Sequence, residues 1–237
     1  MPTVDCLPIY YAKETGIFEG LGLNVQLHSY TSQLDCDTAL LQRVVQGGFT
    51  DTFRLEAYGE KASGLQVMWK GEARWQLFAC ASLRIKSLQR LKGRTVVISR
   101  QSAENAALEE ALVSVGLNKE DVYKPQVNDL RLRTEMLLGK QIDAALLTWP
   151  YTEMAAAEGH RLLYAQPKES QASCFVMDEA WLEADEANKK QFKLLEKGKD
   201  MALDSLQMKG PAAYSEILQK NYGIVKAMAD TLQLPTH

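Results

Sequence analysis

The sequence predicts an α/β protein of two lobes, with mostly parallel sheets flanked by helices and a helical C-terminal tail. Short apolar strands alternate with amphipathic helices over the first two thirds of the chain. This alternation is typical of βαβ units, whose sheets are covered by helices on both faces. A second set of such elements starts near Lys92 and Gly93, and the pattern after Met177 is almost entirely helical.

In the first set, helical periodicity and strand alternation follow one another directly. Helices are expected at 7–18, 32–46 and 52–62. Strands are expected at 24–29, 48–50, 66–69 and 75–81. Gly20 and Gly22 end the first helix, because glycine is a common helix stop signal.

The second set repeats the same order. Strands are expected at 95–99, 123–127, 142–147, 161–164 and 173–177. Helices are expected at 103–115, 129–138 and 151–158. The chain is expected to cross from the first lobe to the second near 78–85 and to return near 170–177. The first lobe would then span 1–82 and the second lobe 83–170. Residues 171–237 would form the return crossover and a helical tail that packs back on the first lobe.

Composition excludes several classes of function. The 237 residues are 46% hydrophobic and 24% charged, with a net charge of -3, which is typical of an ordinary globular protein. The sequence has no excess of Lys and Arg that would attract nucleic acid, so a nucleic-acid partner is not expected. No apolar run approaches the roughly 20 residues that a membrane-spanning helix needs.

Four segments resemble one known family. They are Leu-Pro-Ile-Tyr-Tyr-Ala-Lys-Glu-Thr-Gly-Ile-Phe at 7–18 followed by Gly-Leu-Asn-Val at 22–25, Gln-Gly-Gly-Phe-Thr-Asp at 46–51, Leu-Lys-Gly-Arg-Thr-Val at 91–96, and Ile-Asp-Ala-Ala-Leu-Leu-Thr-Trp-Pro-Tyr at 142–151. In this order they resemble the nitrate/sulfonate/taurine and thiamine-precursor-like (NMT1/THI5-like) substrate-binding proteins of ABC importers.

The resemblance implies a type II periplasmic binding fold without enzymatic activity or cofactor. It also implies a precursor with a leader, a place in the periplasm or on a lipoprotein anchor outside the cytoplasm, and a permease and an ATPase as partners. A monomer is expected. The family's first strand would precede residue 1, so the sequence is expected to begin late and the first sheet to lack that strand.

Ligands of open parallel sheets bind outside the carboxyl ends of the strands, where helix N-termini offer free N–H groups and a partial positive charge. Small polar and aromatic residues occupy those loops here. The predicted ligand-binding residues are Asp5, Tyr10, Tyr30, Thr31, Ser32, Thr50, Asp51, Thr52, Arg100, Gln101, Ser102, Thr148, Trp149 and Tyr151.

Structural roles compete with binding at several of these positions. Ser32, Thr52 and Ser102 are good helix N-caps whatever the function. Asp51 could cap a helix or pair with Arg54, and Trp149 could belong to the core. The ligand therefore stays open: Arg100 and the helix N-termini suit an anion such as a sulfonate, and the aromatic residues suit a pyrimidine-like ring.

Signatures of catalysis are thin. There is no Gly-x-Ser-x-Gly elbow and no His-Glu-x-x-His, and the three histidines lie far apart. No catalytic residue and no metal site is predicted. The alternative is an enzyme of the same fold, from the menaquinone pathway or similar to a pyrimidine synthase, acting on a small metabolite. The cysteines form no metal-ligand spacing, and pairing of Cys80 with Cys174 requires their strands to be neighbours.

Overall fold

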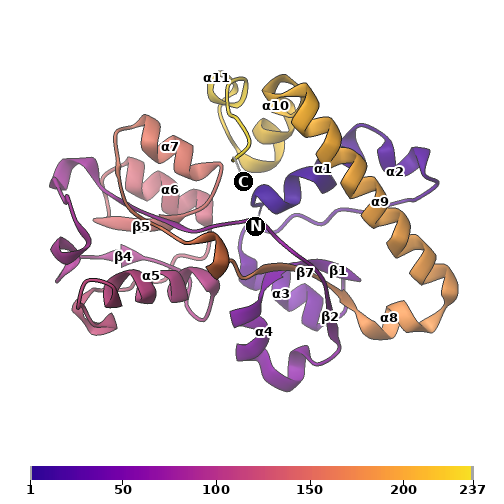
Figure 1. The fold of residues 1–237 in the computed structure, drawn as a ribbon, viewed down its shortest axis with the longest axis horizontal. Helices are drawn as coiled ribbons and strands as arrows, with labels where there is room; N and C mark the ends of the chain where they lie inside the picture. Colours follow the sequence, from indigo (N-terminus) through magenta and orange to yellow (C-terminus); the bar gives the residue numbers. More distant parts are fainter. Residues whose placement is uncertain (1, 236–237) are drawn as a thin grey trace.

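The computed structural model describes residues 2–235 and shows two lobes, each with its own sheet (Figure 1). The strands of the first lobe are β1 (Gly47–Asp51), β2 (Leu65–Lys70) and β7 (Ser173–Asp178), in the order β1-β7-β2. Its helices are α1 (Leu7–Glu14), α2 (Ile17–Gly20), α3 (Gln33–Leu41) and α4 (Thr52–Tyr58).

The second lobe holds the larger sheet. Its strands are β3 (Gln76–Ala79), β4 (Val96–Val97), β5 (Ala144–Leu147) and β6 (Arg161–Ala165), in the order β4-β5-β3-β6. Its helices are α5 (Ala103–Val113), α6 (Leu130–Leu138) and α7 (Tyr151–Ala157). All four residues of β5 are buried, as expected for a strand covered on both faces.

The lobes exchange one strand each. β7 enters the first sheet between β1 and β2 and runs antiparallel to both. β3 enters the second sheet between β5 and β6, again antiparallel to both, while β4 and β5 are parallel. The α/β prediction is confirmed, but most ladders are antiparallel because each central strand arrives from the other lobe. The first crossing also comes earlier than 78–85, since residues 76–79 already belong to the second sheet.

Several predicted elements are interrupted. The helix expected at 7–18 is divided into α1 and α2 by Gly16, whose φ of 75° is left-handed. The helix expected at 32–46 ends at Leu41, just before Arg43 at a φ of 56°. Residues 24–29 belong to no ladder, and residues 123–127 form only isolated parallel bridges. Alternation of apolar and polar residues favours an extended backbone, but a β-strand also needs hydrogen bonds to a neighbouring strand.

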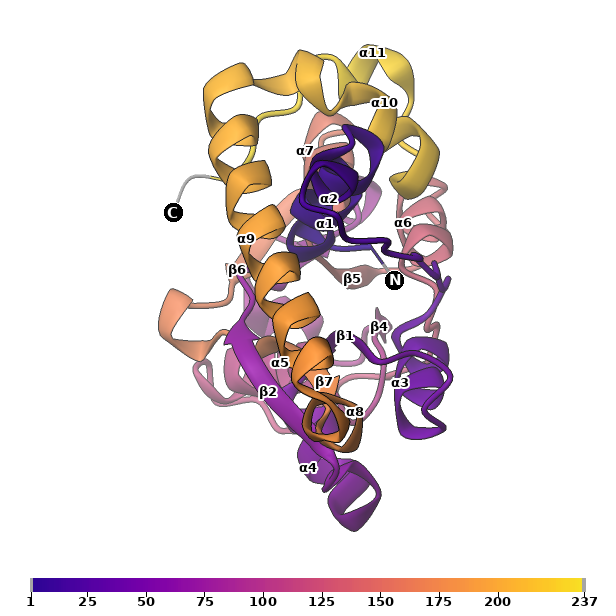
Figure 2. The same cartoon turned by 90° about the vertical axis from the view of Figure 1, so that its right-hand side faces the viewer.

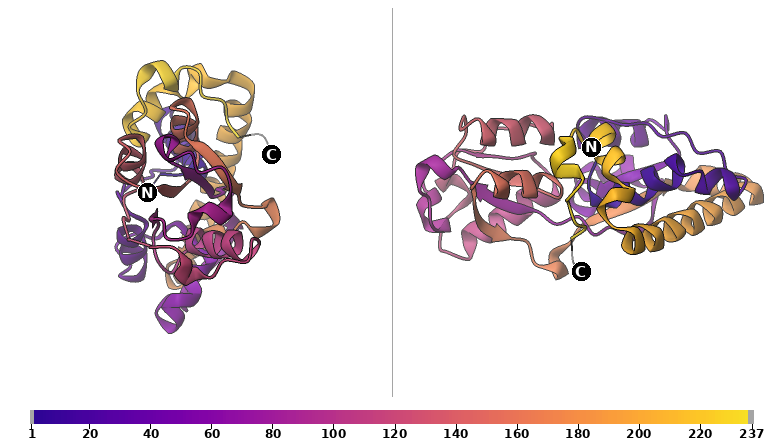
Figure 3. Two further views of the ribbon diagram at one scale, coloured as in Figure 1. Left: turned by 90° about the vertical axis from the view of Figure 1, so that its left-hand side faces the viewer. Right: turned by 90° about the horizontal axis from the view of Figure 1, so that it is seen from above.

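The C-terminal tail covers one face of both lobes. Its helices are α8 (Glu179–Ala184), α9 (Glu186–Lys209), α10 (Ser215–Ile217) and α11 (Lys226–Ala229). α9 runs along α1 (Figure 2) and also contacts α2, where a Cβ on Gly198 would lie 2.6 Å from the ring of Phe18, so only glycine allows this close approach. The helices that follow cross the junction of the lobes (Figure 3).

The predicted alternatives for the cysteines are resolved by this topology. Cys80 follows β3 in the second lobe, whereas Cys174 lies on β7 in the first. Both are buried free thiols, so the disulfide considered between them does not form.

Candidate functional site between the lobes

The first wall of the site is the strand-to-helix turn from β1 to α4. Asp51 ends the strand and caps the helix, with its Oδ1 accepting the backbone N–H of Arg54 at 3.0 Å. The Arg54 Nε atom lies 3.2 Å from Asp51 Oδ2. Both alternatives for Asp51, a cap and a pair with Arg54, are therefore correct. Burial, opposed by the charge of Arg54, raises the pKa of Asp51 to about 6.

Asp37 on α3 extends this wall into a buried acidic network. Its carboxylate accepts hydrogen bonds from Thr50 Oγ1 at 2.8 Å, from Tyr58 Oη at 2.9 Å and from Gln33 Nε2 at 2.9 Å. It also forms an ion pair with Arg54 Nη1 at 3.4 Å. Because two carboxylates share one guanidinium, this wall carries an excess of negative charge.

The second wall is organised by a fully buried ion pair, Glu104 with Arg133. Arg133 also donates to the carbonyl oxygens of Val127 at 2.7 Å and Leu146 at 2.9 Å, and to Ser99 Oγ at 3.1 Å. These three acceptors lie where β4, β5 and the extended segment between them finish. One guanidinium thus holds the strand ends that face the first lobe.

The two walls are in contact. Asp51 Oδ1 accepts the backbone N–H of Ala103 at 3.2 Å, so the N-terminus of α5 points at a carboxylate of the other lobe. Ser32, the N-cap of α3, pairs in an isolated antiparallel bridge with Asp129, the N-cap of α6. The N-termini of α3 and α4 thereby meet those of α6 and α5.

The predicted site residues fall into three groups. Those at the interlobe face and buried are Ser32, Thr50, Asp51 and Ser102. Those exposed beside the caps are Thr31, Thr52, Arg100 and Gln101. Thr148 is buried at the end of β5, and its Oγ1 has no hydrogen-bond partner in the described part of the chain. The structure brings the first group together at the interlobe face, and their contact with a ligand stays a prediction.

The remaining predicted residues have other partners. Trp149 Nε1 donates to Gln233 O at 3.0 Å and Tyr151 Oη donates to Tyr222 O at 3.0 Å, so both anchor the C-terminal tail. Their polar atoms are engaged and their rings are buried, so both residues have a packing role, and their contact with a ligand stays a prediction.

Asp5 and Tyr10 have polar partners in the first lobe and its crossover, and Asp5 lies close to the interlobe face because Ser173, to which it bonds, is the register partner of Asp51. The Asp5 carboxylate accepts Ser173 Oγ at 2.6 Å and the N–H of Ala73 at 3.3 Å, which fixes the crossover between β2 and β3. Tyr10 and Tyr30 line a cavity inside the first lobe. The contact of these three residues with a ligand stays a prediction.

The sequence patterns did not identify Asp37, Glu104 and Arg133, whereas Arg54 was expected only as a possible partner of Asp51. A signal was present for Glu104 and Arg133. Arg133 lies on the buried stripe of α6 with Leu130 and Leu137, and Glu104 lies on the buried stripe of α5 with Ala107 and Leu108. A charged residue on an apolar stripe indicates a buried pair, because an unpaired charge there is costly.

Within residues 2–235, no three His, Cys, Asp or Glu side chains are grouped so as to hold a metal ion. None of the helices in that range combines the length and the apolar content of a membrane span.

Two lobes that exchange a strand and face each other through helix N-termini define a two-lobed binding-protein fold of the periplasmic type. Comparison with known proteins agrees. The family described as "NMT1/THI5 like" matches residues 3–208. The chain belongs to this NMT1/THI5-like family. No curated protein matches it.

Solved structures show the same fold. The alkanesulfonate-binding protein SsuA of Xanthomonas axonopodis pv. citri, bound to MOPS, superposes with a TM-score of 0.78 at 16% identity, over 96% of this chain and 80% of that one. The periplasmic aliphatic sulphonate binding protein SsuA of Escherichia coli gives 0.69 at 18% identity, over 95% and 78%. The desulfurization enzyme DSZB gives 0.69 at 14% identity, over 99% and 82%. At these identities the likeness shows the fold alone.

Proposed function

We propose that the chain is the solute-binding component of an ABC importer and closes its lobes around a small polar or anionic molecule. The observation that carries this proposal is the meeting of helix N-termini across the lobes, through Asp51 with Ala103 and Ser32 with Asp129. N–H groups at such termini bind anions, and a closed pair of lobes removes the ligand from water.

The fold supports the same proposal. Two of the structural neighbours are sulfonate-binding proteins, and one is described as periplasmic. By this analogy the protein works outside the cytoplasm, in the periplasm or on a lipid anchor, and delivers its ligand to a permease driven by an ATPase. The ligand classes that suit the site are sulfonates, nitrate-like anions and pyrimidine-like thiamine precursors.

Thermal-shift measurements over these ligand classes test the proposal. A ligand at 100 times its Kd adds about 2.7 kcal/mol to the free energy of unfolding, provided that it binds only the folded state. Formation of a product from a candidate metabolite, with no other protein present, would instead establish the enzyme alternative. The absence of any stabilising ligand among sulfonates, nitrate and pyrimidines would refute the proposed ligand classes.

Arg100 offers a sharper test. It is exposed and lies beside the N-cap of α5, so Arg100→Ala should weaken an anionic ligand at least tenfold, about 1.4 kcal/mol, and leave unfolding nearly unchanged. Arg90→Ala is the matched control, since Arg90 is exposed in the same lobe but precedes β4 instead of following it. Isothermal titration calorimetry with both variants measures the affinity for the anionic ligand. Unaltered affinity in Arg100→Ala removes this residue from the site.

A further inference from the structure

The contact between the lobes buries more acidic than basic side chains. Asp37 and Asp51 of the first lobe share the guanidinium of Arg54, at 3.4 Å and 3.2 Å. On the facing side, Glu104 and Arg133 of the second lobe neutralise each other in a fully buried pair. Among these five side chains the negative charges exceed the positive ones by one. An uncompensated buried charge is costly, and binding a proton relieves that cost.

The two carboxylates of the first wall differ in how well their charge is held. Besides Arg54, Asp37 accepts hydrogen bonds from three uncharged side chains, those of Gln33, Thr50 and Tyr58. Asp51 accepts only from the backbone N–H groups of Arg54 and Ala103, both on its Oδ1 atom. Asp51 is therefore the carboxylate on which a proton relieves the excess of negative charge.

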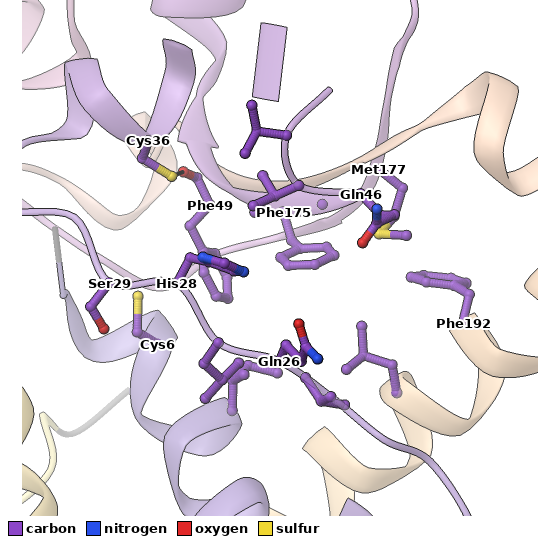
Figure 4. A pocket seen from close by; sticks show the side chains of 18 of the residues that line it. Cys6, Gln26, His28, Ser29, Cys36, Gln46, Phe49, Phe175, Met177 and Phe192 are labelled. Atoms are coloured by element: carbon purple, nitrogen blue, oxygen red, sulfur yellow. Dashed lines mark hydrogen bonds between the residues drawn. The ribbon is translucent and has the colours of Figure 1, made fainter. Parts of the chain in front are cut away.

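The second lobe covers the Asp51 carboxylate. The side chain is only 11% exposed, and it bonds directly to Ala103 at the N-terminus of α5. Asp51 does not line the cavity inside the first lobe, whose walls include Cys36 and Phe49 (Figure 4), so that cavity brings no solvent to it. Opening the lobes exposes this carboxylate to water, while Arg54 stays beside it because both belong to the first lobe.

Burial dominates the titration of Asp51. It raises the pKa of this carboxyl to about 6, although the charge of Arg54 and the N–H groups of Arg54 and Ala103 oppose it. On opening, the carboxyl loses both its cover and the Ala103 donor. The loss of cover has the larger effect, because burial is the strongest influence on this group and the Ala103 bond one of the weaker ones. The pKa of Asp51 therefore falls toward its ordinary value of 3.8 in the open form.

Other titratable and charged groups surround Asp51 from both lobes. They are Asp37, Arg54 and Tyr58 of the first wall, Cys174 on β7, Asp5 beside β7, the exposed Arg100 before α5, and Glu104 with Arg133 of the second wall. Burial raises the pKa of Tyr58 and of Cys174 to about 12, so both stay neutral. Burial also raises the pKa of Asp5, whose bonds lie at the crossover between β2 and β3.

We propose that closing the lobes takes up one proton on Asp51, so that a fall in pH favours the closed form and a rise in pH favours the open one. This inference rests on the opening and closing that the proposed function requires. The protonated carboxyl still offers an acceptor oxygen to Ala103, and it leaves Asp37 and Arg54 as a neutral pair. Any ligand that the closed form holds is then bound more tightly at the lower pH.

Small-angle scattering of the ligand-free protein at about pH 7.5 and about pH 5 tests this coupling. With a pKa of about 6 in the closed form and one near 3.8 in the open form, linkage raises the ratio of closed to open molecules about tenfold at the lower pH. The radius of gyration should therefore shrink. The carboxyl carbon of Asp51, followed by NMR, should titrate near pH 6.

Two variants separate Asp51 from the other carboxyls. Asp51→Asn keeps the helix cap and an acceptor for Ala103 but takes up no proton, so it should have the same radius of gyration at both pH values. Asp5→Asn removes the other carboxyl whose pKa is raised by burial, and it should still become more compact at the lower pH.

An unchanged radius of gyration in the natural sequence would overturn the proposal. So would a response to pH that persists in Asp51→Asn, or a carboxyl carbon of Asp51 that titrates near pH 4. None of these measurements uses a ligand, so failure here and failure of the proposed function are separable.

Discussion

Single charged side chains in two buried clusters define how the lobes meet. Asp37, Asp51 and Arg54 hold the end of β1, and Glu104 with Arg133 holds the strand ends opposite. A buried ion pair contributes little net stability, because desolvation offsets the attraction between the charges. These clusters instead fix the positions of the loops at the interlobe face. Each buried charged side chain contacts several neighbours at once, and the loops are held by those contacts.

Removing one partner of such a pair is costly. Arg133→Met should lower the free energy of unfolding by about 3–5 kcal/mol, because Glu104 and three buried acceptors lose their donor. Urea denaturation measures the loss. Arg131→Met is the control on the same helix, since its pair with Glu135 is exposed and such pairs contribute at most about 1 kcal/mol. Equal losses in the two variants would contradict the role given to Arg133.

The two arginines also show what sequence could and could not predict. Arg131 and Arg133 are two residues apart, and nothing in the residue type distinguishes them. They differ in which face of helix α6 they occupy: Arg131 is on the exposed face, and Arg133 is on the buried face. The N-caps Ser32, Asp51 and Ser102 were predictable because capping is local. The partners across the lobes were not, since they depend on contacts distant in sequence.

Among the elements, backbone conformation decides where helices stop. Periodicity predicted one helix over 7–18, yet Gly16 adopts a left-handed φ and α2 starts at a new angle. The strand predicted at 24–29 from its alternation is wrong, because these residues pair with no other strand. Local pattern thus fixes the conformation of a segment, while its hydrogen-bond partners come from elsewhere in the chain.

Gly16 and Gly20 make a matched pair for testing this account. Neither has a neighbouring atom within 4 Å of an added Cβ, so a steric clash plays no part. Gly16→Ala should destabilise by about 1 kcal/mol, because alanine resists a φ of 75°. Gly20→Ala should be neutral or stabilising by about 0.4–1 kcal/mol, since this glycine is helical. Chemical denaturation gives both values, and a loss in the Gly20 variant as large as in the other would refute the explanation.

The whole molecule is held together by exchange between the lobes. β3 and β7 each complete the sheet of the lobe they enter, and the C-terminal tail covers the junction through Tyr222 and Trp149. The two crossovers, at 71–75 and 166–172, are joined at their ends by backbone bonds from Gly71 N–H to Ser173 O and from Gln166 N–H to Trp75 O. Under the proposed function these crossovers act as the hinge, and the helix N-termini of the two walls make the contacts that closing requires. The order of elements was predictable from sequence, but the antiparallel entry of β3 and β7 was not, because short apolar runs carry no direction.

Closure should therefore depend on contacts that cross the interlobe face, above all on Asp51. Asp51→Ala removes the cap of α4, the buried ion pair with Arg54 and the bond to Ala103, so it should cost more than the roughly 1 kcal/mol of a cap alone and also populate a more open form, with a larger radius of gyration in small-angle scattering. Asp178→Ala is the matched control: Asp178 likewise ends a strand of the first lobe and caps a helix, α8, with no bond to the second lobe. It should lose less stability, because its ion pair is with the exposed Arg43 whereas that of Asp51 is with the buried Arg54, and it should keep its shape. A larger radius of gyration in the Asp51 variant alone supports a role of this residue in holding the lobes together, and identical profiles would show that it has none.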